Sequence, residues 1–330
     1  MRPKLTIAIP TYNRSSKLSE CVDRVIEYGK DLNIEIIISD NASTDNTQEV
    51  VERIKKNNPE ISYYRNSENL GFDGNFLNCF EKAKGQYVWL LSDDDILLPG
   101  AIESVLVGLE KNPVCMHLNS SGIENEEPLV TGVARFKVDG LKEYTDKNDF
   151  IEEIGIFCTF VSSLVFDTEL VKKIENKEKY FKTNILQSNV YFETMKNDGL
   201  YIINTFNCLA ARGNKTVHYD ILRIWVKSYS DLLLSVAPEC GFNEQRMSEV
   251  LRTGLSTSVY EFVLTFRQTC DHEKNWDREC IWPYIERYPE LVDMYKEAVD
   301  CPVGRLKWLK LKQRIKRKIK SLYPRFSALT

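Results

Sequence analysis

Three consecutive carboxylates follow an apolar run in this chain. Asp93, Asp94 and Asp95 come directly after Ser92 and the run 87–91 (YVWLL). Burying so much like charge at the end of a strand is costly unless a cation or dense hydrogen bonding compensates it. A divalent metal with oxygen ligands, itself bridging to phosphate, commonly does so. The alternative is a helix cap, but one Asp is enough for a cap. The pattern therefore favours a site for a divalent metal and a phosphate group.

The first hundred residues contain the elements that must position these acids. Apolar runs predict strands at 5–9, 34–38, 61–65 and 87–91, and the stretches between them predict helices at 16–28, 46–57 and 73–83. This alternation predicts a parallel sheet with helices on both faces. Ligands bind such sheets at the carboxyl ends of the strands, which is where the acids lie.

A polar turn follows each predicted strand at that edge. These turns are 10–14 (PTYNR), 39–46 (SDNASTDN), 66–74 and the acidic cluster itself. Pro10 is expected to end the first strand, and Asp73 to cap the helix that follows the third turn. No glycine-rich phosphate loop is present. Phosphate would therefore be held through a metal.

Composition places the chain among ordinary globular proteins. It has 330 residues, of which 43% are apolar and 28% charged. No segment approaches the run of about 20 apolar residues that spans a bilayer. Residues 1–4 lead straight into a short strand, so we expect no signal peptide. The nine cysteines are odd in number and contain no Cys-x-x-Cys pair, which indicates reduced thiols of a cytosolic protein.

The end of the chain is strongly basic. From Arg305 onward there are ten Lys or Arg and no acid, whereas the preceding 304 residues carry a net charge of −14. Apolar residues recur there at steps of three and four, at Trp308, Leu311, Ile315, Ile319, Leu322 and Phe326. This pattern predicts a basic amphipathic helix that binds an anionic membrane surface. Two alternatives are that the stripe packs on the acidic body, or that the tail binds nucleic acid, which its few stacking residues disfavour.

The middle of the chain is less regular. Strands are predicted at 158–167 and 201–203, and a helical pattern runs from about 231 to 298. These patterns predict a catalytic domain over residues 1–225, a helical region over 226–303 and a tail helix over 304–330.

Four segments in this order and spacing carry a family resemblance. LTIAIPTYNR, IIISDNASTDNT, ENLGFDGN and GQYVWLLSDDDILLPGAI resemble the nucleotide-sugar domain of the family 2 glycosyltransferases. The resemblance covers residues 4–110 closely and 155–225 in outline. It implies a GT-A fold, an α/β architecture with a Rossmann-like mixed sheet and helices on both faces. It also implies an inverting enzyme that uses a nucleoside-diphosphate sugar and Mn²⁺ or Mg²⁺.

The resemblance also implies which residues bind the donor and the metal. Asp40 would accept the imide N–H of uracil or thymine, which favours UDP or dTDP, although a capping role is the alternative. Arg212 would neutralise the leaving diphosphate. Asp94 is the expected metal ligand, and Asp93 would lie near the metal or the ribose. His218 is a further candidate ligand, with a base or a surface residue as the alternatives. The full set of donor-binding candidates is Pro10, Thr11, Tyr12, Asn13, Asp40, Asn69, Gly71, Asn75, Asp93 and Arg212.

The catalytic base departs from the family pattern. Where such enzymes carry an acid, this chain reads 186–189 (LQSN), without a carboxylate. Glu193 is the nearest acid and is the predicted base, with Asp95 as a second catalytic candidate in a supporting role. The gap motivates an alternative function, a nucleotide-sugar-binding partner that has lost transfer and is tethered to a glycan assembly complex. A nucleotidyltransferase is a third reading, which the turn 10–13 disfavours because it lacks a glycine-rich basic loop.

These expectations combine into one picture. The chain is predicted to move a sugar onto a hydroxyl of a lipid-linked glycan in bacterial polysaccharide assembly. It would work from the cytoplasm, held peripherally on the inner face of the membrane by its tail.

Overall fold

The computed structural model describes residues 2–126, 129–212, 220–269 and 276–322. The chain forms two compact units. Unit 1 comprises residues 1–213 and 232–247, and unit 2 comprises residues 214–231 and 248–330. The division at residues 225 and 303 that the sequence suggested stays a prediction.

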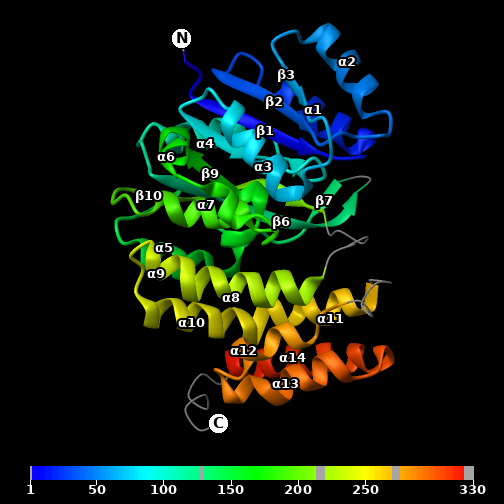
Figure 1. Cartoon of the computed structure of the whole chain (residues 1–330), viewed down its shortest axis with the longest axis vertical. Helices are drawn as coiled ribbons and strands as arrows, with labels where there is room; N and C mark the ends of the chain where they lie inside the picture. Colours follow the sequence, from blue (N-terminus) through cyan, green and yellow to red (C-terminus); the bar gives the residue numbers. More distant parts are fainter. Residues whose placement is uncertain (1, 127–128, 213–219, 270–275, 323–330) are drawn as a thin grey trace. The chain divides into compact units, whose positions relative to one another are not determined.

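Unit 1 is built on one mixed sheet with the strand order β3-β2-β1-β4-β9-β6-β10-β5. Figure 1 shows β3, β2 and β1 side by side, in blue. The first four strands are parallel, as predicted, whereas β9 runs antiparallel to both of its neighbours. The short strands β7 and β8 pair with β6 and β10. The bounds are β1 Leu5–Thr11, β2 Ile34–Asp40, β3 Ser62–Arg65, β4 Tyr87–Leu90, β5 Ile96–Leu97, β6 Cys115–Glu126, β7 Leu129–Thr131, β8 Leu141–Tyr144, β9 Leu164–Asp167 and β10 Tyr201–Ala211.

Apolar side chains that alternate along the strands bury both faces of the sheet. One face joins Leu5, Ile7 and Ile9 to a core shared with α1 (Ser15–Tyr28), α2 (Thr47–Asn57) and α4 (Ala101–Leu109). The other face is covered by α3 (Gly71–Lys82), α6 (Thr168–Lys173) and α7 (Leu186–Thr194). There the rings of Phe80 and Phe166 pack edge to face at 4.9 Å. This packing fixes the strand ends from which the polar turns emerge.

Three local predictions were wrong. β1 continues through Pro10 to Thr11. Its pairing with β4 ends at Ala8, so Pro10 lies on an unpaired edge of β1. A backbone N–H is not needed on that edge, which is why proline is tolerated there. Residues 158–163 form 3₁₀ turns, and only Leu164–Asp167 is a strand. Asp73 does not cap its own helix. It is buried in the first turn of α3 and accepts hydrogen bonds from the backbone amides of Asn184 (3.1 Å) and Leu186 (3.2 Å), at the start of α7.

The described residues after β10, in the ranges 220–269 and 276–322, are largely helical, as the pattern over 231–298 predicted, and include three π-helical stretches. Among the described residues, no helix is both long and apolar enough to cross a membrane. The remaining bounds are α5 Lys147–Ile154, η1 Gly155–Thr159, η2 Val161–Ser163, η3 Lys177–Tyr180, η4 Arg223–Ser228, α8 Tyr229–Asp231, η5 Leu232–Val236, α9 Ala237–Glu239, α10 Glu244–Gly254, η6 Leu255–Val259, α11 Tyr260–Thr269, η8 Glu279–Ile281, α12 Trp282–Ile285, α13 Pro289–Asp300 and α14 Val303–Leu322.

Candidate active site

The turns after β1 and β2 are locked together by Asn13. This residue has a positive φ of 53°, which Asn tolerates better than most residues. Its side-chain oxygen accepts from the backbone N–H of Thr44 at 2.7 Å, and its own N–H donates to the hydroxyl of Ser43 at 2.9 Å. Tyr12, next to it, is 42% exposed. The arrangement presents an aromatic face at the carboxyl edge of the sheet.

Asp40 is fully buried at the end of β2 and is held on both oxygens. One accepts from the N–H of Ser43 at 2.8 Å, and the other from the hydroxyl of Tyr63 at 2.7 Å, with the Arg65 Nε at 3.4 Å. Burial and the bond to Asp40 raise the pKa of Tyr63 well above its usual range, so Tyr63 stays a donor. The carboxylate is therefore fixed in orientation.

The third turn is organised by asparagines. Asn41 donates to the side-chain oxygen of Asn69 (2.7 Å) and to the carbonyl of Gly71 (3.1 Å). Gly71 has a φ of 72°, a conformation that favours glycine. Asn75 is buried. Its side-chain oxygen accepts from the Ser39 hydroxyl at 2.7 Å, and its side-chain nitrogen donates to the Ser39 backbone carbonyl at 3.0 Å. These contacts favour a scaffolding role for Asn75, whereas Asn69 and Gly71 lie nearer the surface.

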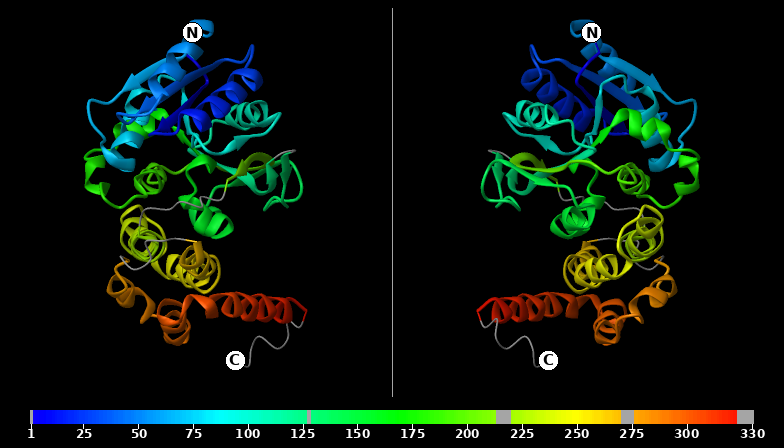
Figure 2. Two further views of the ribbon diagram at one scale, coloured as in Figure 1. Left: turned by 90° about the vertical axis from the view of Figure 1, so that its right-hand side faces the viewer. Right: turned by 90° about the vertical axis from the view of Figure 1, so that its left-hand side faces the viewer.

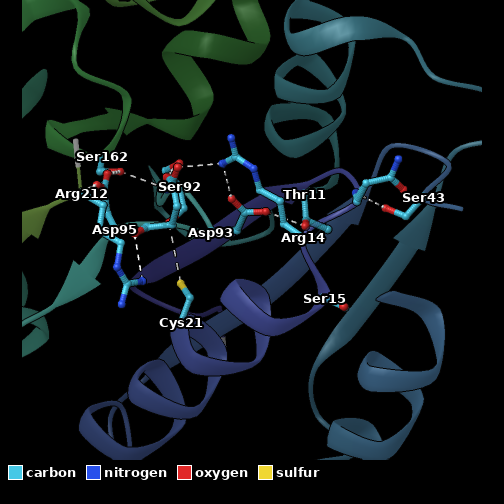
Figure 3. A network of polar contacts seen from close by, with 12 residues as sticks. Thr11, Arg14, Ser15, Cys21, Ser43, Ser92, Asp93, Asp95, Ser162 and Arg212 are labelled. Atoms are coloured by element: carbon cyan, nitrogen blue, oxygen red, sulfur yellow. Dashed lines mark hydrogen bonds and ion pairs between the residues drawn. The ribbon is translucent and has the colours of Figure 1, made fainter. Parts of the chain in front are cut away.

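The acidic cluster contains a cation of its own. The Arg14 Nη1 lies 3.0 Å from Asp93 and 2.8 Å from Asp94 (Figure 3). Asp93 also accepts from the hydroxyl of Thr11 at 2.6 Å, and Asp94 from that of Ser92 at 2.6 Å. Asp93 is buried, while the Asp94 side chain is 18% exposed. Asp94 is thus the acid of this pair that is more open to solvent.

Asp95 points away from Arg14 into the interior. Its oxygens accept from the hydroxyl of Ser162 at 2.5 Å and from the backbone N–H of Arg212 at 3.3 Å. Burial, strengthened by neighbouring Asp94, raises the pKa of Asp95 to about 7. Burial also raises the pKa of Asp93 to about 6, although Arg14 opposes this rise. The cluster therefore holds more negative charge than its surroundings compensate.

Arg212 reaches the same cluster from the end of β10. Its guanidinium donates to both oxygens of Glu20 on α1, at 2.9 and 2.8 Å, and to the backbone carbonyl of Asp94 at 3.3 Å. Arg212 therefore lies beside the acids (Figure 3), and its role toward the diphosphate stays a prediction. His218 falls outside the described residues.

Glu193 lies in α7 and is surrounded by cations. One oxygen accepts from Lys179 (2.9 Å) and from the hydroxyl of Tyr180 (2.6 Å), and the other lies 2.6 Å from the Lys196 Nζ. Burial alone would raise the pKa of Glu193, but these partners lower it to about 2. So weak a base, with both oxygens engaged, favours a structural role. At the position where an acid was expected, Gln187 and Ser188 are buried and contribute no carboxylate.

The donor chemistry of the acidic cluster fits a divalent cation. Asp93 and Asp94 offer hard oxygen ligands and already share one positive group, Arg14. Over the described stretches of chain, no group of three or more His, Cys, Asp or Glu side chains is arranged to hold a metal.

Arg14, Tyr63 and Ser162 belong to this site but were not among the predicted candidates. Arg14 stands inside the PTYNR segment, so its position one residue beyond Asn13 could have identified it. Tyr63 and Ser162 carried no local signal, because each acts through a partner distant in sequence.

Comparison with known proteins places this site in a family. A family profile described as "Glycosyl transferase family 2" matches residues 6–175. Abequosyltransferase RfbV of Salmonella typhimurium is 46% identical over 95 residues, which cover 28% of each chain. The GalNAc(5)-diNAcBac-PP-undecaprenol beta-1,3-glucosyltransferase of Campylobacter jejuni is 31% identical over 195 residues, which cover 58% of this chain and 60% of that protein. The chain thus matches less than two thirds of the length of either relative.

Solved structures agree on the fold. S. aureus TarS 1-349 in complex with UDP-GlcNAc superposes with a TM-score of 0.62 at 18% identity, covering 94% of this chain and 89% of that one. The mannosyltransferase PcManGT from Pyrobaculum calidifontis, in complex with GDP-Man and Mn²⁺, gives 0.51 at 14% identity, covering 98% and 88%. The predicted GT-A fold is confirmed. Since the family profile covers more than half of the chain, this protein belongs to glycosyl transferase family 2.

Proposed function

We propose that this enzyme transfers a sugar from UDP or dTDP to a hydroxyl of a lipid-linked glycan, with inversion at the anomeric carbon. The observation that carries the proposal is the convergence of three features at one sheet edge: the fixed carboxylate of Asp40, the exposed ring of Tyr12, and the acids Asp93 and Asp94. A nucleobase needs a hydrogen-bond acceptor and a stacking ring, and a metal-bound diphosphate needs carboxylates for its metal.

Asp40 would select the base. Its oxygens are aimed by Ser43 and Tyr63, and a carboxylate accepts from the imide N–H of uracil or thymine. Guanine would bind there only if its own ring N–H lay in the plane of the Asp40 carboxylate. Tyr12 would stack on the base, since its ring is partly free. Thr11, Asn13 and the backbone at Pro10 would line the path toward the ribose.

The acidic cluster would hold the metal and orient the diphosphate. Asp94, supported by Asp93, would bind Mn²⁺ or Mg²⁺, and the bound ion would supply positive charge for the departing diphosphate. Arg212 would add a second positive charge on the same side, held in place by Glu20. Asp95 would keep Arg212 in position by accepting a hydrogen bond from the backbone N–H of Arg212. His218 as a further metal ligand stays a prediction, because it lies outside the described residues. The identity of the catalytic base is also left as a prediction.

Two further features support a lipid-linked acceptor. The Campylobacter relative is named for action on an undecaprenol-linked glycan. The C-terminal helix is basic and amphipathic, which suits work at the inner surface of a membrane. The test is sugar transfer from a series of UDP and dTDP sugars to an undecaprenyl-diphosphate glycan, with Asp94→Asn as the inactive comparison. Transfer without added metal would contradict the metal role.

A second candidate function is favoured by α7. Neither Gln187 nor Ser188 can act as a strong base, and Glu193 is held by two lysines. A protein that binds a nucleotide sugar but does not transfer it would show metal-dependent UDP or dTDP binding with no turnover on any acceptor.

A further inference from the structure

The last helix, α14, has two apolar faces that point in different directions. Leu306 and Leu309 are buried, and the helix packs against α11. Trp308, Leu311 and Ile315 have 50%, 55% and 49% of their surface exposed. Because an α-helix advances by 100° per residue, the two faces lie about 150° apart around the axis. The predicted stripe therefore does not provide the packing of this helix.

The helix is held in this rotation by polar contacts. The Lys310 ammonium lies 3.3 Å from the side-chain oxygen of Gln268, and Gln313 donates to the backbone carbonyl of Ser256 at 3.0 Å. Both partners belong to the same unit as α14. Figure 2 shows α14, in red, as one continuous helix. Turning the exposed residues inward would break these contacts and expose Leu306 and Leu309.

Basic residues border the exposed apolar face, which we call the α14 stripe (Trp308, Leu311, Ile315). Lys307 and Lys312 are exposed and project on either side of it. The Lys312 Nζ lies 5.0 Å from the centre of the Trp308 ring, and Arg305 lies over the same ring at 5.6 Å. The sequence continues with Lys316, Arg317, Lys318 and Lys320 and contains no acid after Asp300.

We infer that the α14 stripe is an interfacial binding surface for an anionic lipid bilayer. Apolar side chains of this kind enter the acyl boundary, and flanking cations bind lipid headgroups. Charge complementarity favours an anionic partner, and Trp308 between Arg305 and Lys312 favours lipid over an acidic protein groove, because a Trp flanked by cations suits the headgroup level of a bilayer. Nucleic acid would be attracted by the charge but gains nothing from Leu311 and Ile315. The inference rests on the proposed function only in that the bilayer also carries the acceptor.

The test is co-sedimentation of the full chain with vesicles of phosphatidylcholine alone or mixed with phosphatidylglycerol. The chain should bind only the mixed vesicles, with an affinity that falls as salt is raised. The triple variant Trp308→Ser, Leu311→Ser, Ile315→Ser should bind at least about tenfold more weakly. The pair Lys307→Gln, Lys312→Gln should lower affinity by about tenfold on the mixed vesicles, through the lost headgroup attraction. A control, Val133→Ser with Val138→Ser, removes two side chains that are each 79% exposed in unit 1 and should bind normally.

Equal vesicle binding by the triple variant, or no binding by the parent chain, would overturn the inference. Binding of duplex DNA that the triple variant retains, with no vesicle binding, would identify nucleic acid as the target and overturn it as well. Thermal unfolding of each variant shows whether it is folded, and Leu311→Ser alone replaces the triple variant if that one is not. Calorimetric titration of nucleotide into the same proteins distinguishes failure of the membrane inference from failure of the proposed donor site. The α14 variants leave the donor-site residues unchanged.

Discussion

The Arg14 guanidinium and the Asp94 carboxylate form an ion pair at 2.8 Å, in the place where a metal-bound diphosphate is expected. The same nitrogen also reaches Asp93, so one side chain compensates two acids. Binding of a metal and loss of this pair are therefore linked.

Arg14→Gln should strengthen metal binding to the nucleotide-free protein. Without the guanidinium, Asp93 and Asp94 lose the cation that competes with the metal for their oxygens, so Mn²⁺ should bind several-fold more tightly. The free energy of unfolding in metal-free buffer should fall by about 1–2 kcal/mol, since the pair is partly exposed. Calorimetric titration of Mn²⁺ measures the first effect and urea unfolding the second. Arg53→Gln, an exposed arginine on α2, is the control. Unchanged or weaker Mn²⁺ binding would refute the competition.

Tyr63→Phe should weaken pyrimidine nucleotide binding without removing it. The variant keeps the ring but leaves one oxygen of Asp40 with a single weaker partner, Arg65. We expect a cost of about 1 kcal/mol in stability and a several-fold loss of UDP or dTDP affinity. Tyr64→Phe, the neighbouring residue on β3, is the matched control. If both variants bind alike, Asp40 is not the base-reading group.

Glu193→Gln tests whether Glu193 is a catalytic base or a structural residue. Loss of a catalytic base should lower kcat by about 100-fold or more. We expect kcat to stay within about threefold and the free energy of unfolding to fall by about 1–2 kcal/mol, because Lys179 and Lys196 lose their partner. The pKa of Glu193 is depressed to about 2, so its contribution to stability is present above about pH 4.5 and is lost as pH falls toward 2. Glu175→Gln, at an exposed position, is the control. A loss of kcat of about 100-fold or more in a folded Glu193→Gln protein would show that Glu193 is the catalytic base.

Acidity should stabilise the metal-free acidic cluster. The pKa of Asp95 is raised to about 7 and that of Asp93 to about 6, so the folded state keeps protons that the unfolded chain releases above about pH 3.8. The contribution of these acids to stability therefore falls as pH rises from about 4 to 7 and is constant above that range. Asp95→Asn should flatten this part of the plot of melting temperature against pH, whereas the exposed Asp293→Asn should not. Identical slopes in both variants would contradict the burial of charge at Asp95.

The sequence predicted the frame of this site better than its contacts. The strand ends and the acids were predictable, because apolar runs and polar turns are local signals. The path of β1 through Pro10 was not, since it depends on where β4 stops pairing. The role of Asp73 at the start of α7 joins residues more than 100 positions apart. Glu193 was chosen by proximity in sequence, and only the fold brings Lys179 and Tyr180 to it.

The central claim is that the acidic cluster holds a metal on which donor binding depends. The most direct test is calorimetric titration of UDP, dTDP, GDP and CDP with Mn²⁺ or Mg²⁺ and again with chelator, for the parent chain and for Asp94→Asn. We expect one pyrimidine diphosphate to bind only with metal, and Asp94→Asn to lose this binding while Asp293→Asn keeps it. Equal binding with chelator, or by folded Asp94→Asn, would contradict the account.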